Sequence, residues 1–433
     1  MTKIAPAIAS LFPSELPLQL RAYDGSAAGP ADSPYVMELT SPRGLSYILT
    51  APGDLGLGRA YVAGDLVLHG AHPGNPYEPF SLLKDHTDFG IPSPQKIAAL
   101  VGALGIRNLV PPPPPPQEHL PGWRHRVEAL RGNVASLATW GRHSQQRDAD
   151  AIHHHYDVSN TFYEHVLGPS MTYTCAVFPT EDATLEEAQE NKYDLICRKL
   201  DLKPGQRLLD LGCGWGGMVR HAAKHYGVKA LGVTLSREQA NWAAEEIKCQ
   251  GLDDVAEVRY SDYRDVPEGD FDAVSSIGLT EHIGVDNYPA YFSFIEGKLK
   301  PEGRLLNHCI TRHDSRGSNK AGAFIDRYVF PDGELTGSGT IVRAVENTGL
   351  EVQHHENIRH HYARTLQGWS ENLEANWDAC VAETSEGTAR VWGLYMVGSR
   401  IAFERNEIQL HHVLATKTVD GVSGYPLRPD FGV

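Results

Sequence analysis

The sequence predicts an α/β protein whose doubly wound, mostly parallel sheet of seven strands follows a smaller, β-rich α+β domain. From about residue 185 onward, apolar residues at helical spacing alternate with short apolar runs typical of strands. Residues 207–217 pass from a buried strand directly into a glycine-rich turn, which is how such sheets begin. The chain of 433 residues is also too long for one ordinary core, so two domains are expected.

Composition narrows the class of protein. Hydrophobic residues make up 41% and charged residues 21%, which is typical of a soluble globular chain. The net charge of −15 gives no overall basic surface for nucleic acid. The six cysteines form no CxxC pair, which argues against structural zinc and against a disulfide framework, and no metal site is expected. There is no signal peptide and no apolar run of membrane-spanning length, so the cytoplasm is the expected compartment.

Residues 1–110 are predicted to form an accessory domain that serves a lipid surface or dimerisation. The runs YVMEL and LSYIL flank the turn Ser41–Gly44, which predicts a β-hairpin. Residues 95–110 have apolar residues at helical spacing and predict a helix packed on its own domain, with a membrane-facing helix as the alternative.

Six consecutive prolines, Pro111–Pro116, mark the predicted domain boundary. A polyproline helix is stiff and favours a spacer, so residues 111–121 are interpreted as a linker, with an SH3-type ligand as the lesser alternative. Residues 122–147 then carry five arginines against one acid. They are the best local patch for phosphate head groups, unless they form an ordinary solvated helix face.

The glycine-rich stretch follows the first strand of the predicted sheet. Gly212, Gly214, Gly216 and Gly217 allow the backbone to turn tightly and to approach a ligand closely. A dinucleotide site needs an acid about 20 residues later, but the next strand ends in Thr234-Leu235-Ser236. Asp210 instead stands just before the glycines, as in S-adenosylmethionine (SAM) methyltransferases. The alternative is a glycine-rich turn without a ligand.

The remaining elements follow from periodicity. The pattern predicts strands at 207–211, 229–235, 256–262, 271–279, 303–311, 350–358 and 407–416, the last as an edge strand. It predicts helices at 186–200, 218–226, 237–250, 287–299 and 340–349, and within 365–384 and 386–405. Residues 122–416 therefore form the predicted catalytic domain, and residues 417–433 a C-terminal tail.

Five motifs carry a resemblance to a known family. They are HHYDVSNTFYEHVLGPSMTYTCAVF, LDLGCGWGG, VTLSREQ, EHIGVDNYPAYF and FIDRYVFPDGEL. Their order and content closely resemble the cyclopropane fatty acid synthase and mycolic acid cyclopropane synthase family, over about residues 140–416. The N-terminal domain resembles that of longer bacterial members that act on lipids. The resemblance implies a SAM-methyltransferase sheet and SAM as the methyl donor.

The resemblance also implies a SAM site. Tyr173 and Thr174 would contact SAM, and Ile277 would line its pocket. The other positions that match the family's SAM contacts are Asp210, Gly212, Cys213, Gly214, Thr234, Leu235, Ser236, Gln239, Tyr263 and Arg264. Of these, residues 212–214 would face the methionine part, residues 234–239 the ribose, and residues 263–264 the adenine.

The resemblance implies a second site, for a bicarbonate ion that acts as the base. The matching positions are Cys175, Glu281, His308, Ile310 and Tyr362. Backbone groups at Cys175 and Ile310 can fix a small planar anion, while imidazole and phenol can donate to its oxygens and a carboxylate can accept its hydroxyl hydrogen. Taken singly, each of these side chains also has an ordinary structural interpretation.

The implied reaction is methyl transfer from SAM to the cis double bond of an unsaturated phospholipid acyl chain. Bicarbonate would deprotonate the resulting carbocation and a cyclopropane ring would close. Val177, Thr280 and Ser399 depart from the common pattern, so a 10-methylene product is the close alternative, and a small-molecule methyltransferase is the second. The expected setting is cytoplasmic and peripheral on the inner face of the membrane, with a homodimer, and a reductase partner if the product is a methylene chain.

Overall fold

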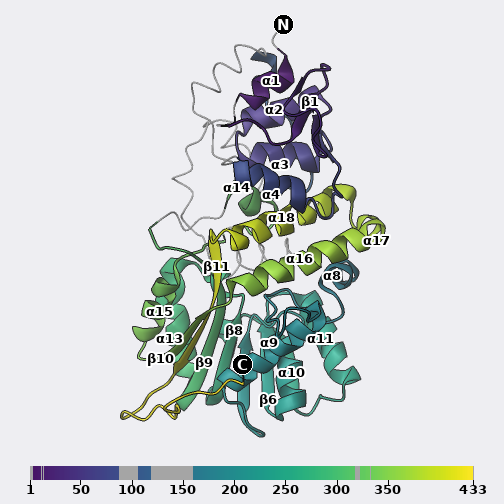
Figure 1. The fold of residues 1–433 in the computed structure, drawn as a ribbon. Helices are drawn as coiled ribbons and strands as arrows, with labels where there is room; N and C mark the ends of the chain where they lie inside the picture. The colour runs from purple at the N-terminus through teal and green to yellow at the C-terminus, as the bar shows by residue number, and fades with distance from the viewer. Residues whose placement is uncertain are drawn as a thin grey trace. The chain divides into compact units, whose positions relative to one another are not determined.

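The computed structural model describes residues 3–10, 12, 14–86, 106–118, 159–316, 322–331 and 333–432. The chain divides into two compact units. The N-terminal unit comprises Met1–Ala135, Gly322–Pro331 and Trp369–Ile401. The larger unit comprises Ser136–Ala321, Asp332–Gly368 and Ala402–Val433. Figure 1 colours the elements of both units in chain order.

The N-terminal unit is built on a small mixed sheet. Its order is β2-β1-β3-β4, with β1 parallel to β3 and the other pairs antiparallel. The strands are β1 (Gln19–Ala22), β2 (Ala27–Ala28), β3 (Val36–Leu39) and β4 (Leu66–His69). The helices that lie wholly in this unit are α1 (Ile4–Ala9), α2 (Pro42–Thr50), α3 (Asp54–Val62), α4 (Tyr77–His86), η1 (Ile106–Leu109), α14 (Ala323–Tyr328) and α17 (Trp377–Glu383). The α+β character predicted for this part of the chain is confirmed.

The predicted hairpin around Ser41–Gly44 is wrong. YVMEL does contain β3, but LSYIL lies inside helix α2. The Ser41 side chain accepts a hydrogen bond from the Gly44 backbone N–H at 3.2 Å, and Pro42 occupies the first turn. A serine N-cap followed by proline is the typical start of a helix, and this local signal outweighs the β-branched and aromatic character of the following residues.

The proline run packs within the N-terminal unit. Pro115 is buried, and the Tyr47 hydroxyl donates to the carbonyl of Pro113 at 2.5 Å. Directly after the run, the buried carboxylate of Glu118 pairs with Arg59 at 2.6 Å and with Arg327 of α14 at 3.3 Å. This ion cluster explains why Gly322–Pro331, which the predicted boundaries assign to the catalytic domain, belongs to this unit. Where that domain begins stays a prediction.

Three sequence-based expectations lie outside the described residues. They are most of the helix predicted at 95–110, the arginine-rich stretch 122–147, and the first residues of the HHYDVSN motif at 154–158. Their structural roles remain predictions.

The larger unit contains the predicted seven-stranded sheet. Its order is β10-β11-β9-β8-β5-β6-β7, and the pairs from β9 to β7 are parallel. The strands are β5 (Arg207–Leu211), β6 (Lys229–Thr234), β7 (Ala256–Tyr260), β8 (Phe271–Ile277), β9 (Leu299–Arg312), β10 (Glu351–Asn357) and β11 (Ile408–Thr416). The last strand was expected at the edge, which is wrong: β11 lies between β10 and β9 and is antiparallel to both.

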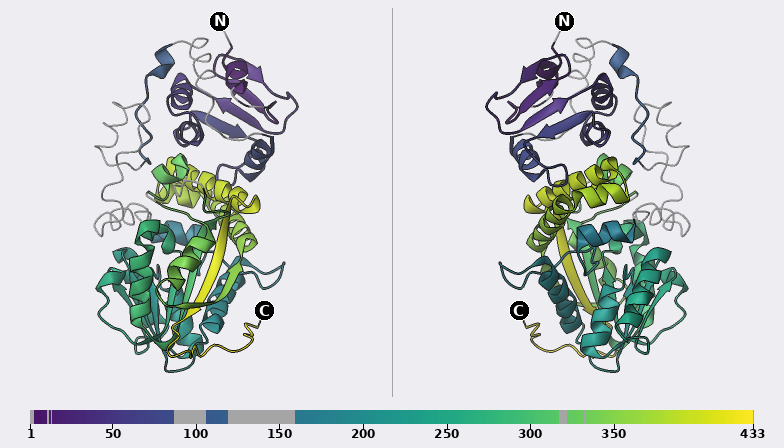
Figure 2. Two further views of the ribbon diagram at one scale, coloured as in Figure 1. Left: turned by 90° about the vertical axis from the view of Figure 1, so that its left-hand side faces the viewer. Right: turned by 90° about the vertical axis from the view of Figure 1, so that its right-hand side faces the viewer.

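Helices cover both faces of this sheet, as Figure 2 shows. Apolar residues of α9, α10 and α11 form one core with the strands, and those of α13 and α15 form another. The helices of this unit are α8 (Asn160–Leu167), α9 (Leu185–Lys199), α10 (Gly217–Tyr226), α11 (Arg237–Cys249), η2 (Tyr263–Asp265), α12 (Thr280–Ile283), η3 (Val285–Asn287), α13 (Tyr288–Lys298) and α15 (Ser338–Glu346). The unit boundary falls within α16 (Arg359–Ala375) and α18 (Glu386–Glu404).

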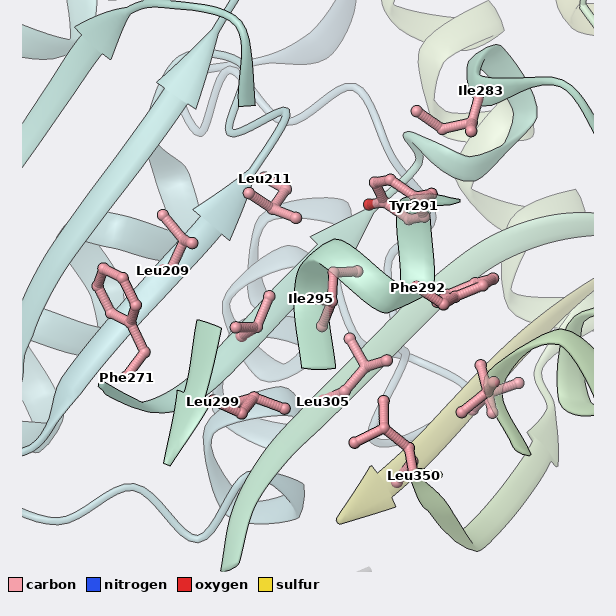
Figure 3. Close-up of a cluster of buried hydrophobic side chains, with 14 of the residues drawn as sticks. Leu209, Leu211, Phe271, Ile283, Tyr291, Phe292, Ile295, Leu299, Leu305 and Leu350 are labelled. Carbon is pink, nitrogen blue, oxygen red and sulfur yellow. The ribbon is translucent and has the colours of Figure 1, made fainter. Parts of the chain in front are cut away.

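The core beneath α13 explains the apolar run of β5. Leu209 and Leu211 point into the α13 face, whereas Leu208 packs on the opposite face, because successive strand residues alternate sides. Figure 3 shows Tyr291, Phe292 and Ile295 of α13 in one cluster with Leu209 and Leu211. Burial on both faces is the reason that β5 reads as a nearly continuous hydrophobic stretch.

The topology fixes where a ligand site can lie. The chain runs from β5 outward to β6 and β7, then returns to β8 on the other side of β5. In sheets of this type, ligands bind outside the carboxyl ends of the strands at that reversal. Among the described residues, no helix combines the length and the apolar character needed to cross a membrane.

The packing of α13 gives a stability prediction. Phe292 is fully buried, so Phe292→Ala is expected to lower the unfolding free energy by about 3–5 kcal/mol, since it leaves a cavity. Phe294→Ala on the same helix removes an aromatic ring that is only partly buried, and is expected to cost less than half as much. Urea unfolding of the two variants measures the difference, and equal losses would contradict this view of the core.

Candidate active site

The residues predicted to bind SAM gather at one edge of the larger sheet. Asp210 lies near the end of β5 and Gly212–Gly214 follow this strand. Thr234–Gln239 connect β6 to α11, and Tyr263 and Arg264 follow β7. Ile277 ends β8, the strand on the other side of β5. These strands are parallel, so their carboxyl ends meet at one edge. The structure therefore brings the predicted set together at the location where the topology favours a ligand.

The glycine loop is shaped for close approach. Gly212, Gly214 and Gly216 have φ values of 68°, 55° and 71°, which side-chain-bearing residues rarely adopt. A Cβ at Gly212 would lie 3.0 Å from Leu279, whereas one at Gly214 would meet no atom within 4 Å. The backbone at Gly214 thus borders open space, which fits a ligand lying against the loop. The Cys213 backbone N–H donates to Val233 at 2.9 Å and fixes the loop on β6.

The turn from β6 into α11 is held by its own polar groups. The Thr234 hydroxyl donates to the side chain of Gln239 at 2.8 Å and accepts from the Ser236 N–H at 3.2 Å. The Ser236 hydroxyl caps α11 by accepting from the Gln239 N–H. Leu235 lies between them and is partly buried. These neutral groups are the ones predicted to replace the acid of a dinucleotide site.

Asp262, which the sequence analysis did not single out, organises the turn after β7. Its carboxylate accepts from the Arg264 backbone N–H at 2.9 Å and from the guanidinium at 2.6 Å. The guanidinium also lies 5.3 Å from the centre of the Tyr263 ring. Arg264 is therefore committed to Asp262 and Tyr263. The sequence signal that could have identified Asp262 is an aspartate placed two residues before an arginine at the end of a strand.

A buried lysine lies beside the Tyr173–Thr174 segment, and sequence reasoning missed it. Lys192 of α9 is fully buried and donates to the Thr174 hydroxyl at 3.0 Å. Gln189, one turn earlier, donates to the Thr174 carbonyl at 3.0 Å. Burial lowers the pKa of Lys192 to about 7, and Cys175 and Asp210 are its nearest acidic influences. Lys192 could not be predicted to be buried, because the amphipathic pattern of α9 assigns lysines to the solvent-exposed face.

Asp210 is a buried acid that interacts electrostatically with Lys192. It is the last residue but one of β5, and its carboxylate accepts from the Ser275 hydroxyl of β8 at 2.7 Å. Burial raises the pKa of Asp210 to about 7, partly offset by Ser275 and by the positive charge of Lys192. Asp210 and Lys192 therefore each shift the pKa of the other, near residues predicted to bind SAM.

The second predicted set centres on Glu281. One oxygen of its carboxyl group accepts from the Ile310 backbone N–H at 2.6 Å, which joins α12 to β9. The other oxygen, Oε2, is buried and has no hydrogen-bond partner among the described residues. Burial raises the pKa of Glu281 to about 7. A buried, unpartnered carboxylate oxygen is costly, so it fits a small ligand that donates a hydrogen bond there.

Cys175 and Tyr362 are linked through a neighbouring helix turn. The Ala176 N–H donates to the Thr365 hydroxyl at 3.0 Å, and the Phe178 N–H to His361 Nδ1 at 3.0 Å. These contacts hold the segment after Cys175 against the turn of α16 that carries Tyr362. Cys175 and Tyr362 are both buried, and burial raises the pKa of the Cys175 thiol, so this cysteine is a thiol and not a thiolate.

His308 stands two residues before Ile310 on β9, so both side chains lie on one face of the strand. The His308 carbonyl accepts from the Gly278 N–H at 2.8 Å, directly after Ile277. Burial, followed by the positive charge of Lys192, holds the pKa of His308 well below its usual range. The imidazole is therefore neutral and can donate one hydrogen bond.

Comparisons with known proteins show the family of this chain. The family model described as mycolic acid cyclopropane synthetase matches residues 143–413. The chain belongs to this family of SAM-dependent C-methyltransferases. A probable fatty acid methyltransferase of Mycobacterium tuberculosis is 60% identical over 415 residues, covering 95% of this chain and 94% of that protein.

Two cyclopropane synthases are also similar to this chain, one in sequence and one in solved structure. The cyclopropane-fatty-acyl-phospholipid synthase of Escherichia coli is 36% identical over 300 residues, which cover 68% of this chain and 75% of that protein. The mycolic acid cyclopropane synthase CmaA1, solved with SAH (S-adenosylhomocysteine) and CTAB, has a TM-score of 0.58 and 31% identity. The structural match covers 62% of this chain and 97% of the CmaA1 chain.

Among the described residues, one group of side chains outside these two sets could hold a metal ion. Glu190 of α9 and His221 and His225 of α10 place one ligand atom each within 4.8 Å of one another. Glu190 and His225 are exposed. The group belongs to neither the glycine-loop set nor the Glu281 set, and the methyl transfer considered below has no step that requires it.

The buried carboxyl group predicts a pH effect on stability. The folded pKa of Glu281 is raised from its ordinary value of 4.5 to about 7. Between these values the folded chain retains a proton that the unfolded chain has lost, so wild-type stability falls as the pH rises. Glu281→Gln cannot ionise, and its stability relative to wild type is expected to increase by about 3 kcal/mol from pH 4 to pH 8.

Urea unfolding at several pH values measures this difference. Glu245→Gln changes an exposed glutamate on α11 and is the matched control, which should follow the wild-type profile. If the Glu281→Gln curve stayed parallel to wild type across the whole pH range, the raised pKa would be refuted.

Proposed function

We propose that this protein transfers the methyl group of SAM to the cis double bond of an unsaturated acyl chain in a phospholipid, and that bound bicarbonate then removes a proton so that a cyclopropane ring closes. The observation that carries the proposal is the Glu281 carboxyl group. One of its oxygens is tied to Ile310, and the other is buried and has no hydrogen-bond partner among the described residues.

The similar proteins support a lipid substrate. The Escherichia coli relative is named for phospholipid-bound fatty acyl chains, and the Mycobacterium tuberculosis relative for fatty acids. CmaA1 was solved with SAH, the product of methyl donation, together with CTAB. A long apolar acceptor is therefore the substrate class that best fits this chain.

The residues of the anion set can each take a role. Glu281 Oε2 would accept the hydroxyl hydrogen of bicarbonate, while His308 and Tyr362 would donate to its other oxygens. The Ile310 N–H is already used by Glu281, so its contribution is to hold the carboxylate rather than to bind the anion alone. Lys192 acts electrostatically on both His308 and Cys175, and its charged form would favour an anion held near them.

The glycine-loop set would orient the donor. SAM supplies an electrophilic methyl group on sulfur and leaves as S-adenosylhomocysteine. An isolated alkene is a weak nucleophile, so alignment with that methyl group matters, and such orientation is worth about 7–11 kcal/mol in favourable cases. Lys192 and Gln189 hold Thr174 in place, and the hydrogen bond from the Cys213 N–H to Val233 holds the glycine loop on β6. The carbocation that forms on the acyl chain must then be protected from water until the base acts.

A 10-methylene product is the second candidate. The relative that matches 95% of this chain at 60% identity is named a fatty acid methyltransferase, whereas the cyclopropane synthase of Escherichia coli matches 68% at 36%. Loss of a proton from a chain carbon, after a hydride shift, would leave a methylene branch. A reductase partner would then complete a methyl branch. In either case we propose peripheral contact with the inner face of the membrane; dimerisation also remains a proposal.

Product analysis tests the proposed reaction. The protein is incubated with SAM and vesicles of oleoyl phospholipid, and the released acyl chains are examined by mass spectrometry. We expect a mass increase of one CH2 that survives mild catalytic hydrogenation, as a cyclopropane does. A product that takes up hydrogen readily would select the methylene alternative. Methylation of soluble amines or phenols with none on vesicles would contradict lipid chemistry altogether.

Bicarbonate dependence tests the proposed base. In buffer freed of dissolved carbon dioxide, the rate is expected to fall and to recover when bicarbonate is added. Glu281→Gln is expected to lower kcat by about 100-fold or more, because positioned proton transfer contributes at least that much. The exposed Glu245→Gln serves as the control. A rate that is indifferent to both bicarbonate and Glu281→Gln would refute this assignment of the base.

A further inference from the structure

A row of buried polar side chains crosses three neighbouring strands and includes His308. On the paired strands β9 and β11, His308 lies directly opposite His412, and on β11 and β10, His412 lies directly opposite Glu356. Residues directly opposite each other in adjacent strands project from the same face of a sheet. Lys199, the last residue of α9, reaches this row from the helix that covers the face.

The row is joined by continuous hydrogen bonds. His308 Nδ1 lies 2.8 Å from His412 Nε2, and His412 Nδ1 lies 2.9 Å from Lys199 Nζ. Lys199 also donates to the Glu356 carboxylate. The two histidines and the lysine are essentially fully buried, whereas the Glu356 side chain is 35% exposed. The row thus leads from the proposed anion site to a half-exposed acid.

The chemistry of lysine fixes the direction of each bond. A protonated lysine has three donors and no acceptor. Burial lowers the pKa of Lys199, and the Glu356 carboxylate that accepts its hydrogen bond opposes this and favours the charged form. His412 Nδ1 must therefore accept from Lys199, so the hydrogen of a neutral His412 resides on Nε2. That hydrogen points at His308 Nδ1, which must in turn accept it. The hydrogen of His308 is consequently on Nε2.

Both imidazoles are neutral, as this assignment requires. Burial holds the pKa of His412 well below its usual range, and the charges of Lys199, His308, Lys192 and His354 lower it further. Burial and the charges of Lys192 and Lys199 do the same for His308. One hydrogen on each ring then leaves a single consistent arrangement of donors and acceptors.

A purely structural role explains such a row poorly. Burying a lysine and two histidines carries a large desolvation cost, and apolar side chains of similar size often stabilise a core equally well or better. What the polar row provides, and apolar side chains cannot, is a defined proton position on His308. The alternative tautomer would present a lone pair at Nε2 and would repel an anion there.

We propose that Lys199 and His412 are positioning residues that hold His308 in its Nε2–H tautomer, so that Nε2–H donates to the small anion beside Glu281. The role of the anion as base rests on the proposed function. The tautomer and the contact with the anion do not depend on turnover, and they are tested separately.

The test reads the tautomer directly. Protein with 15N-labelled histidine is examined by long-range 1H–15N NMR, in which a protonated and a bare ring nitrogen have well-separated shifts. The His308 signal is identified by its loss in His308→Gln. We expect Nε2–H in the wild type and a shift of this signal when bicarbonate is added. Wild-type protein in the Nδ1–H form, or no shift at saturating bicarbonate, would overturn the proposal whatever the activity.

Variants at Lys199 extend the test to catalysis. Lys199→Met removes the fixed donor and is expected to yield mixed His308 tautomers and a 10- to 100-fold lower kcat/KM for bicarbonate, the usual loss for such supporting partners. The KM for SAM should not change, and Lys199→Arg should restore both readouts. Lys203→Met changes an exposed lysine just after α9 and is the matched control.

The possible outcomes distinguish the positioning role of Lys199 and His412 from the proposed methylation of lipid. A mixed tautomer in Lys199→Met with unchanged kcat/KM for bicarbonate would overturn the positioning role. If Lys199→Met does not fold, the wild-type spectrum and its response to bicarbonate still decide the question. A wild-type protein that binds bicarbonate through His308 but methylates no lipid would refute the proposed function while leaving the positioning role intact.

Discussion

The hydrogen bond from the Ile310 backbone N–H to the Glu281 carboxyl group is the contact on which the interpretation of this protein depends. It fixes a short helix after β8 to the carboxyl end of β9, and it places an acid inside the protein with one oxygen satisfied and the other not. A protein interior rarely retains such an oxygen without a use for it. His308, which shares a face of β9 with Ile310, has a neutral imidazole that can donate one hydrogen bond to a small anion.

The site is divided between two kinds of structural element. The glycine loop and the turns after β6 and β7 belong to the general design of a nucleotide-binding sheet, and their polar groups are mostly satisfied by one another. The anion set instead depends on β9 and on the antiparallel strands β11 and β10 beyond it, where His308, His412 and Glu356 align. The proposed donor binding and the proposed base positioning would therefore rest on opposite halves of one sheet, with Lys192 acting electrostatically on Asp210 and on His308.

Much of the larger unit could be predicted from sequence because its signals are local. The glycines after β5, the apolar strands and the caps such as Ser236 each act within a few residues. The predicted set of Glu281, Ile310 and His308 came from family resemblance, and the structure places these residues in contact or on one strand face. The hairpin at Ser41 failed because a cap and a proline outweighed strand propensity.

The interior lysines could not be found in this way. Lys192 and Lys199 sit on an amphipathic helix whose pattern assigns lysine to solvent, and only tertiary contacts show them buried. The same holds for Glu118, whose partners Arg59 and Arg327 are 59 and 209 residues away. Charged residues become buried when distant segments supply partners, and no local spacing records that pairing.

A crystal structure of the protein with S-adenosylhomocysteine and saturating bicarbonate tests the central claim most directly. The account predicts a planar anion within hydrogen-bond distance of Glu281 Oε2 and of His308 Nε2. If Oε2 is instead met by a protein side chain and no anion lies between these two groups, the proposed base site does not exist and the account is wrong.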